Sequence, residues 1–376
     1  MLWIPGPTQV RPELLQEMAR PAIGHRTKAM TDVIERIHPH LRFAFGLDEN
    51  SSAHPAVHST SATGMMEAGL IGAGQKILCL VNGAFSKRWA DIAKALGKDV
   101  TVLEAEWGQV VPMEELDRTL TEQGPFDALT YVMSETSTGT LTPPQDVAAV
   151  VEKHPDTMVF TDVVSAIAGR AIDFDKNRID FAFAGVQKAL ALPPGVALVC
   201  ASDRYLEKAK TVPNRGFYLD PVTFIEGHEK LKTPITPSIP HYFALAQQLE
   251  DISSGKTLPA ADQHLKGAEA WAARFAKHSR MQARTIEWAA SHGLTLLPEL
   301  RQASPCVACI NSGDINVPEL IAGLKEQGFI LGNGYGKLKN ITFRIGHMGD
   351  HTETGLEDLL AAADRVLATR AAKSPA

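Results

Sequence analysis

The chain has little that would suit a membrane, a nucleic acid or an exported protein. Among its 376 residues, no apolar run approaches the roughly 20 residues that a membrane helix needs. Acidic residues outnumber basic ones, 43 to 37, and the net charge of −6 gives no support to nucleic-acid or anionic-membrane binding. The N-terminal sequence MLWIPGPTQVRPELL has neither a basic start nor an apolar signal core. The expected location is therefore the cytoplasm.

Cysteine is also scarce, and its few positions argue against disulfide or metal chemistry. Four cysteines do not make a disulfide framework at this length. Cys79 and Cys200 lie inside apolar runs that resemble strands, so we expect them in the core. Cys306 and Cys309 form a C-x-x-C pair, but the surrounding SPCVACI is a strand pattern and a second ligand pair is missing. The sequence therefore predicts no metal site.

One stretch, IDFAFAGVQKALALPPGVALVC, combines two buried strands with a single lysine. The apolar runs Ile179–Ala184 and Val196–Cys200 predict the strands, and Gly185 with the Pro-Pro-Gly at 193–195 predicts a tight turn between them. The ammonium of Lys188 in that turn has mostly apolar neighbours, so its pKa should fall. Only a neutral amine attacks a carbonyl. A lone lysine between two strands is also typical of a surface turn, and the rest of the chain decides between these interpretations.

The first half of the chain alternates strands with helices. This rhythm predicts a mostly parallel sheet with helices on both faces, and ligands of such sheets collect at the carboxyl ends of the strands. By that rule Phe85, the segment Glu135–Gly139, Asp162 and Lys188 follow four different strands and meet at one edge. The predicted strands are Lys76–Val81, Val100–Glu104, Ala128–Met133 and Met158–Thr161, and the helices between them are Ala84–Leu96, Met113–Leu120 and Asp146–Lys153.

Two polar features precede this alternating region. A helix is predicted from an N-cap at Thr31 to Phe45, and His25 and Arg26 stand just before it. That pair is either solvated at the helix entrance or a receptor for an anionic part of a substrate. The small polar turn Ser59–Gly64 leads into another predicted helix. Hydroxyls and free N–H groups at a helix start bind phosphate well, although serine and threonine there are also ordinary N-caps.

The second half of the chain predicts a separate, smaller unit. Two helical regions, His241–Ile252 and Ala261–Ala290, lead into a new pattern of alternating strands and helices that suits an antiparallel sheet with helices on one side. Its strands are expected at Val307–Ile310 and Ile341–Ile345, and its helices at Val317–Gln327 and Thr354–Ala368. We therefore divide the chain into an N-terminal arm (1–20) that packs with the small domain, a large domain (21–260) and a small C-terminal domain (261–376). The alanine-rich end, 371–376, is expected to be disordered.

The polar groups of the large domain match the needs of one cofactor. Pyridoxal phosphate requires a lysine for its aldehyde, a helix N-terminus for its phosphate, a carboxylate at its ring nitrogen and a flat group on its ring. Lys188, the segment Ser61–Thr63, Asp162 and Phe85 supply these in turn. The carboxylate keeps the ring nitrogen protonated, which makes the ring an electron sink.

The chain closely resembles the class V aminotransferases of fold type I, especially the alanine–glyoxylate and serine–pyruvate aminotransferase group. The resemblance covers essentially the whole length, through PGPTQV, STSATGMMEAGL, VNGAFSKRWADI, ETSTGTLTP, TDVVSAIAG, AGVQKALALPPG and GYGKLKNITFRIGHMGDH. It implies the α/β transferase fold of pyridoxal phosphate enzymes, with a mostly parallel seven-stranded sheet between helices and a smaller C-terminal α+β domain. It also implies a homodimer with shared active sites.

The resemblance assigns roles to single residues. Lys188 would hold the cofactor as an internal aldimine and then move a proton between the substrate Cα and the cofactor, and Asp162 would pair with the ring nitrogen. Phe85, where many relatives carry tryptophan, would stack on the ring. Thr136 would hydrogen-bond the phenolic oxygen of the ring. Arg344 would clamp the substrate carboxylate with its guanidinium fork.

Further positions are implied around the phosphate and the substrate. Relatives often have glycine where this chain has Ala62, and tyrosine at the first of the two positions that reach the phosphate from the partner subunit. His25 and Arg26 resemble the pair that phosphoserine aminotransferases use for the substrate phosphate, but the C-terminal His-Arg that assists them is not apparent here. The residues expected at the cofactor phosphate are Ser61, Ala62, Thr63 and Gln187, with Thr233 and Thr236 contributed across the dimer interface.

The predicted function is transfer of the amino group of serine, alanine or aspartate to a 2-oxo acid such as glyoxylate or pyruvate, by ping-pong chemistry. A phosphoserine:2-oxoglutarate aminotransferase is the first alternative. A lyase of the cysteine-desulfurase type would need a nucleophilic cysteine on a mobile loop and usually a histidine before the lysine, where this chain has Gln187. A non-catalytic protein that kept only the fold is disfavoured, because Lys188, Asp162 and Arg344 are all present.

Overall fold

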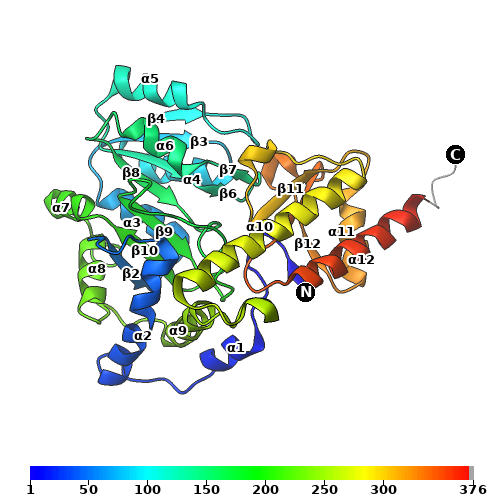
Figure 1. The fold of residues 1–376 in the computed structure, drawn as a ribbon. Coiled ribbons are helices and arrows are strands. Elements are labelled where there is room, and N and C mark those ends of the chain that lie inside the picture. The colour runs from blue at the N-terminus through cyan, green and yellow to red at the C-terminus, as the bar shows by residue number, and fades with distance from the viewer. Residues whose placement is uncertain (372–376) are drawn as a thin grey trace.

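Two β-sheets of different construction organise the chain in the computed structural model, which describes residues 1–371 (Figure 1). The larger sheet has seven strands in the order β2-β10-β9-β8-β5-β3-β4. Its central strands run parallel, whereas β10 is antiparallel to both of its neighbours, β2 and β9. This confirms the predicted mostly parallel seven-stranded sheet. The strands are β2 (His54–His58), β3 (Lys76–Val81), β4 (Asp99–Glu104), β5 (Ala128–Val132), β8 (Met158–Asp162), β9 (Phe181–Gly185) and β10 (Ala197–Ala201).

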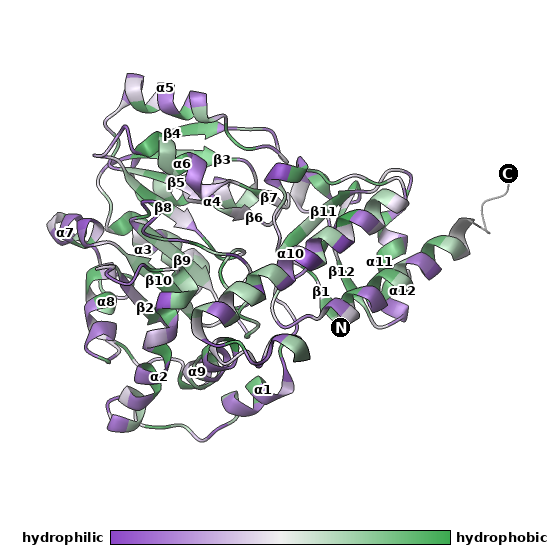
Figure 2. Cartoon of the chain, in the orientation of Figure 1, coloured by the Kyte–Doolittle hydropathy of each residue, from purple (hydrophilic) through white to green (hydrophobic). Residues whose placement is uncertain are grey.

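Helices cover both faces of this sheet because its central strands are apolar on both sides. Side chains alternate along each strand: Leu78 and Leu80 enter the core on one face, and Ile77 and Cys79 enter the core on the other. Figure 2 shows the green strands enclosed by helices whose outer faces are purple. One face packs against α2 (Lys28–Phe45), α5 (Met113–Gln123), α6 (Pro144–Val151) and α9 (Ile239–Ser253), and the other against α3 (Ala62–Ile71), α4 (Ala84–Ala95), α7 (Asp203–Thr211) and α8 (Pro221–Glu229).

The smaller sheet has four strands in the order β1-β12-β13-β11 and lies beside the larger one (Figure 1). Its strands β11, β13 and β12 are antiparallel, as predicted, but the N-terminal arm adds β1 parallel to β12. The bounds are β1 (Leu2–Trp3), β11 (Val307–Asn311), β12 (Ile330–Asn333) and β13 (Thr342–Gly346), with α10 (Gly267–Ser291), α11 (Val317–Glu326) and α12 (Glu353–Ala371) packed on them.

Short elements complete the described chain. The segment α1 (Pro12–Met18) belongs to the N-terminal arm, and a two-stranded hairpin joins β6 (Ser134–Glu135) to β7 (Thr140–Leu141). Three single-turn helices are η1 (Ala260–Asp262), η2 (Leu300–Gln302) and η3 (Gly336–Leu338). Within residues 1–371, none of the helices combines the length and the hydropathy that crossing a bilayer demands.

The structure corrects several element boundaries. Helix α2 begins at Lys28 after an N-cap at Thr27, so the N-cap predicted at Thr31 is wrong; Met30 is buried, and the apolar stripe starts a turn earlier than expected. The helix expected from residue 261 begins only at Gly267. The short strands β1 and β12 and the helix α8 were not predicted. Of the C-terminal end expected to be disordered, residues 372–376 lie outside the described residues.

Candidate active site

A cavity of about 290 Å³ lies at the edge where the parallel strands of the large sheet end. The lysine turn after β9, the end of β8, the start of α3 and the start of α4 all contribute to its wall. Eight of the predicted site residues line this one cavity: Ser61, Ala62, Thr63, Phe85, Thr136, Asp162, Gln187 and Lys188. The strand-end rule therefore selected residues that the fold does bring together.

Lys188 is almost completely buried, with 8% of its surface exposed. Burial first, and the positive charge of Arg344 second, lower the pKa of its ammonium to about 8. Asp162 and Glu135 act in the opposite direction, but they do not cancel the effect of burial. The fall in pKa agrees with the apolar surroundings that the sequence indicated. A usable fraction of this lysine is therefore neutral near neutral pH, which a nucleophilic amine requires.

The N-terminal arm packs directly on this lysine. The Nζ atom of Lys188 donates a hydrogen bond to the carbonyl oxygen of Pro5. Gly6 has a φ of +98°, and a Cβ atom at that position would lie 2.5 Å from Cδ of Lys188. Glycine therefore meets two needs here, a left-handed backbone and contact with the lysine side chain. The arm continues to Thr8, whose backbone N–H donates to the carbonyl oxygen of Gln187 at 3.1 Å.

Asp162 supplies a buried carboxylate at the end of β8. Its Oδ1 accepts a hydrogen bond of 2.8 Å from the backbone N–H of Val164, and no ion pair holds it within residues 1–371. Burial raises its pKa to about 7; the charge of Glu135 acts in the same direction, while Lys188 and Arg88 act against it. A carboxylate with spare acceptor capacity faces the cavity, which suits a partner that brings its own proton.

The start of α3 presents a site for an anion. The side chain of Ser61 is the N-cap and accepts a hydrogen bond of 3.1 Å from the backbone N–H of Gly64. Ala62 and Thr63 follow as the first residues of the helix, where backbone N–H groups have no acceptor within the helix. The hydroxyl of Thr63 accepts a hydrogen bond of 3.1 Å from Arg88. Free N–H groups, the helix dipole and a nearby guanidinium together favour a phosphate.

Glu135 fixes the start of α4 and with it the aromatic wall of the cavity. Its fully buried carboxylate accepts hydrogen bonds from the backbone N–H groups of Phe85 and Ser86, at 3.0 and 2.9 Å, and from the hydroxyl of Ser137. A carboxylate at a helix N-terminus satisfies donors that the helix itself cannot use. The ring of Phe85 is thereby held at the cavity, with the ring of Tyr335 at 5.7 Å between centroids.

Arg344 stands behind the lining rather than in it. Its Nε donates to the carbonyl oxygen of Asn333 at 2.9 Å, and its Nη1 donates to the carbonyl oxygen of Thr136 at 3.0 Å. Burial lowers its pKa, and its charge acts on that of Lys188. Its Nη2 has no hydrogen-bond partner in the described part of the chain. The hydroxyl of Thr136 itself bonds that of the buried Ser165.

Five predicted residues do not line the cavity of this chain: Arg344, which stands behind the lining, and His25, Arg26, Thr233 and Thr236. Arg26 is exposed, and Nε2 of His25 contacts the hydroxyl of Thr236 at 3.5 Å. The hydroxyl oxygen of Thr233 is buried and finds no partner within residues 1–371. Thr233 and Thr236 were expected to act on a partner subunit, so their absence from this cavity leaves that prediction as it stood.

Sequence reasoning missed several residues of the cavity. Arg88 lies three residues after Phe85, so the two share a face of α4; that helical spacing was the available signal. Ser165 follows Asp162 by three residues, in a turn after β8 whose sequence has no periodic pattern that would point to a site. Gly6 and Pro7 come from the far end of the chain, and only the folded arm brings them to Lys188.

These residues fit pyridoxal phosphate. The cavity offers an amine with a lowered pKa, a buried carboxylate with an unused acceptor, helix N–H groups without acceptors and an aromatic ring. Each of these matches a separate group of the cofactor: the aldehyde, the ring nitrogen, the phosphate and the ring face. Lys188, Asp162, the start of α3 and Phe85 would hold them in that order.

Comparison with known proteins supports the same interpretation of the cavity as a pyridoxal phosphate site. A sequence model of the family described as "Aminotransferase class-V" matches residues 11–292. An uncharacterized aminotransferase of Methanocaldococcus jannaschii is 34% identical over 93% of this chain and 88% of its own length. An L-aspartate–glyoxylate aminotransferase of Paracoccus denitrificans is 29% identical over 98% of this chain and 91% of its own. The crystal structure of an alanine–glyoxylate aminotransferase from Nostoc sp. superposes with a TM-score of 0.85, at 27% identity, over 97% of this chain and 94% of that one.

Proposed function

The chain belongs to the class V aminotransferases, and from this premise we propose that it moves the amino group of a small L-amino acid to a 2-oxo acid such as glyoxylate. Membership implies transaminase activity and pyridoxal phosphate as the cofactor. When bound, this cofactor supplies an electron-withdrawing ring that acidifies the Cα–H bond of an attached amino acid. The relatives that act on glyoxylate with aspartate, serine or alanine support the substrate class.

The observation that carries the proposal is the arrangement around Lys188. A single cavity joins this buried amine, the carboxylate of Asp162 and the start of α3. We assign Lys188 as the attachment point for the cofactor and as the base that moves a proton at the substrate Cα. Asp162 would hold the proton on the ring nitrogen, and the start of α3 would bind the phosphate. Phe85 would pack on the ring, and Gln187 would help to hold the phosphate.

Substrate binding is assigned to Arg344. Its Nη2 has no hydrogen-bond partner within residues 1–371, and its two bonds to the backbone carbonyls of Asn333 and Thr136 fix the direction of the fork. A planar fork held in place binds a carboxylate in a bidentate manner at small entropic cost. The amino donor and the 2-oxo acid carry the same carboxylate, so one arginine serves both halves of a ping-pong cycle.

We also propose that the enzyme is a homodimer with shared active sites and acts in the cytoplasm. The buried hydroxyl of Thr233 without a partner supports a further contact that a single chain does not supply. Thr236, three residues further along the chain, is exposed and would reach the phosphate of the other subunit.

The lyase alternative is disfavoured because the cysteines of this chain do not suit the role of a nucleophile. All four cysteines are buried, and burial raises the pKa of Cys79 to about 11 and that of Cys306 to about 12. A nucleophilic cysteine is exposed and has a lowered pKa. The phosphoserine alternative would place His25 and Arg26 at the active site of the other subunit, because both lie outside the cavity of their own chain and His25 contacts Thr236.

A panel of amino donors against three acceptors tests the proposal. Serine, alanine, aspartate and phosphoserine would each be paired with glyoxylate, pyruvate and 2-oxoglutarate, and initial rates measured. We expect a small donor with glyoxylate or pyruvate to give the highest kcat/KM, with parallel lines in double-reciprocal plots. Preference for phosphoserine with 2-oxoglutarate, together with a large loss for Arg26→Ala, would contradict the assignment.

A further inference from the structure

A second cavity lies away from the candidate active site and shares no lining residue with it. It encloses about 440 Å³ between the N-terminal arm, the connection from α9 to α10, helix α10 and the segment that joins β13 to α12. Polar side chains make up much of its wall: Arg11, Lys256, Thr257, Lys277, Asp350 and Glu353. Buried charged groups that line a cavity each need a partner of opposite charge.

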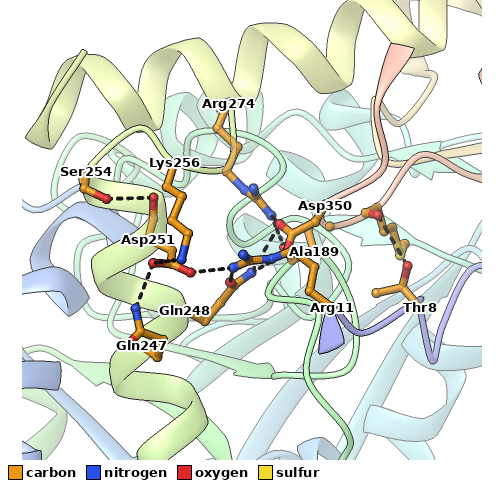
Figure 3. A network of polar contacts seen from close by, with 12 residues as sticks. Thr8, Arg11, Ala189, Gln247, Gln248, Asp251, Ser254, Lys256, Arg274 and Asp350 are labelled. Atoms are coloured by element: carbon orange, nitrogen blue, oxygen red, sulfur yellow. Dashed lines mark hydrogen bonds and ion pairs between the residues drawn. The ribbon is translucent and has the colours of Figure 1, made fainter. Parts of the chain in front are cut away.

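Most of these charges are already paired. Asp350 accepts hydrogen bonds from Nε of Arg11 at 2.6 Å and pairs with Nη2 of Arg274 at 3.0 Å. Asp251 pairs with Arg11 at 2.7 Å and with Lys256 at 3.2 Å. Figure 3 shows this network, with Arg274 reaching from α10 to Asp350 and with Asp251 between Arg11 and Lys256. The remaining carboxylate of the wall, Glu353, pairs with Arg280 at 2.6 Å.

Lys277 is the exception. It is 1% exposed, and its Nζ donates one hydrogen bond, of 3.1 Å, to the carbonyl oxygen of Gly349. Over residues 1–371, no carboxylate lies within the 4.0 Å that defines an ion pair with it. An ammonium has three donors, and a buried one without a counter-charge carries a large desolvation cost. Burial first, and Arg274 second, lower its pKa to about 7.

Thr257, on the same wall of the cavity, is a second polar group with an unmet hydrogen-bonding need. Its hydroxyl oxygen is buried and has no hydrogen-bond partner among the described residues. Buried hydroxyl groups in folded proteins are almost always bonded, so an unbonded one that lines a cavity points to a missing acceptor or donor. An oxygen atom of a bound anion would satisfy both this hydroxyl and the spare donors of Lys277.

We propose that this second cavity binds a small monocarboxylate anion, held by Nζ of Lys277 and Oγ1 of Thr257. In its protonated form Lys277 is one unmatched cation, which calls for one negative charge. A dianion such as phosphate would add repulsion from Asp350 and Glu353, which also face the cavity, and such repulsion is strong in a region of low dielectric. A carboxylate presents two oxygens, one for each donor.

The site lies behind the segment that follows Lys188. The carbonyl group that Lys277 bonds belongs to Gly349, where an added Cβ would lie 2.9 Å from that of Ala191. Arg274 donates to the carbonyl oxygen of Ala189 at 2.7 Å. The second cavity is thus linked to the lysine turn through Gly349 and Arg274, and it shares no lining residue with the candidate active site.

Binding of acetate to the cofactor-loaded enzyme tests this inference, which does not depend on the proposed substrate. The Arg344→Gln background removes the carboxylate site assigned to the active centre, so that any remaining site is seen alone by titration calorimetry. We expect one acetate per chain to bind in that background, and the added Lys277→Met substitution to weaken the binding at least tenfold. Equal binding with and without Lys277, or no binding in the background, would overturn the inference.

Two matched variants guard against an effect on folding. Thr257→Val keeps the shape of the side chain and removes only its hydroxyl, so it should weaken acetate several-fold in a folded protein. Lys256→Met removes a half-exposed charge that is already paired, and should change the affinity less than threefold. Inorganic phosphate should bind more weakly than acetate. Unchanged acetate affinity in Thr257→Val, or tighter binding of phosphate through Lys277, would refute the assignment to a monocarboxylate.

Discussion

Within residues 1–371 two lysines are buried, Lys188 and Lys277, and comparing them shows what marks a cofactor site. Burial lowers the pKa of Lys188 to about 8 and that of Lys277 to about 7. By pKa alone, both amines are available in the neutral form that a nucleophile requires. The difference lies in what surrounds each amine: Lys188 shares its cavity with Asp162, a free helix start and an aromatic ring, whereas Lys277 faces guanidinium groups and paired carboxylates. A lowered pKa makes an amine reactive, and its neighbours decide the reaction.

The largest effect is expected at the first of these lysines. Lys188→Ala should lower kcat by at least about 10²–10⁴-fold, because the base at the substrate Cα is lost. Activity with serine, alanine or aspartate as donors measures it, and circular dichroism verifies the fold. Lys208→Ala, which removes a partly exposed lysine paired with Asp127 and outside the candidate active site, is the control and should keep parental activity. Activity of Lys188→Ala within tenfold of the parent would contradict the catalytic role that distinguishes Lys188 from Lys277.

The carboxylate that distinguishes the two cavities comes next. Asp162→Asn keeps the shape but cannot hold a proton on the ring nitrogen, so kcat should fall by roughly 10²–10³-fold, the range seen when one electrostatic partner of a reacting group is removed. Asp162→Glu should retain more activity than the amide variant, because it keeps the charge. Stopped-flow absorbance of the first half-reaction measures the loss directly. A loss smaller than tenfold in the amide variant would argue against this role.

The arm over Lys188 gives an intermediate effect. At Gly6, alanine would have to adopt a φ of +98° and would meet Cδ of Lys188 at 2.5 Å. Strain of this kind costs of the order of 1–3 kcal/mol. Gly6→Ala should therefore weaken cofactor retention roughly tenfold, measured by the decay of the visible absorption during dialysis. Gly97→Ala, at a positive φ with open space around it, controls for backbone strain alone; equal effects in both variants would mean that the arm does not act through Lys188.

The smallest effect concerns stability and pH. The pKa of Lys277 falls from its ordinary value near 10.5 to about 7 on folding. Below pH 7 both folded and unfolded states carry the proton and the cost of burying the charge is complete; between pH 7 and 10.5 the folded state releases it and the cost shrinks. Lys277→Met should thus raise Tm by a few degrees at pH 6 and by less at pH 9.5. An increase in Tm that is larger at pH 9.5 than at pH 6 would contradict this prediction.

The sequence predicted the large sheet and four residues of the candidate site for one physical reason, whereas Ser61–Thr63 and Gln187 were placed from helix-start chemistry and the family resemblance. Parallel strands end at a common edge, so Asp162, Thr136 and Lys188 could be placed together without coordinates. Short elements escaped, because β1 and β12 have too few residues to show a period. Contacts between distant parts also escaped. Pro5 and Lys188 are 183 residues apart, and Lys277 lies in the middle of a helix whose pattern gives no sign of the cavity beside it.

The most direct test of the central claim is to locate the amine that carries the cofactor. Borohydride treatment of the cofactor-loaded enzyme fixes the cofactor covalently to that amine, and peptide mass spectrometry identifies the labelled residue. The account predicts one label per chain, on Lys188, and none on Lys277. A label on Lys277, or no label on Lys188 in an active preparation, would contradict it.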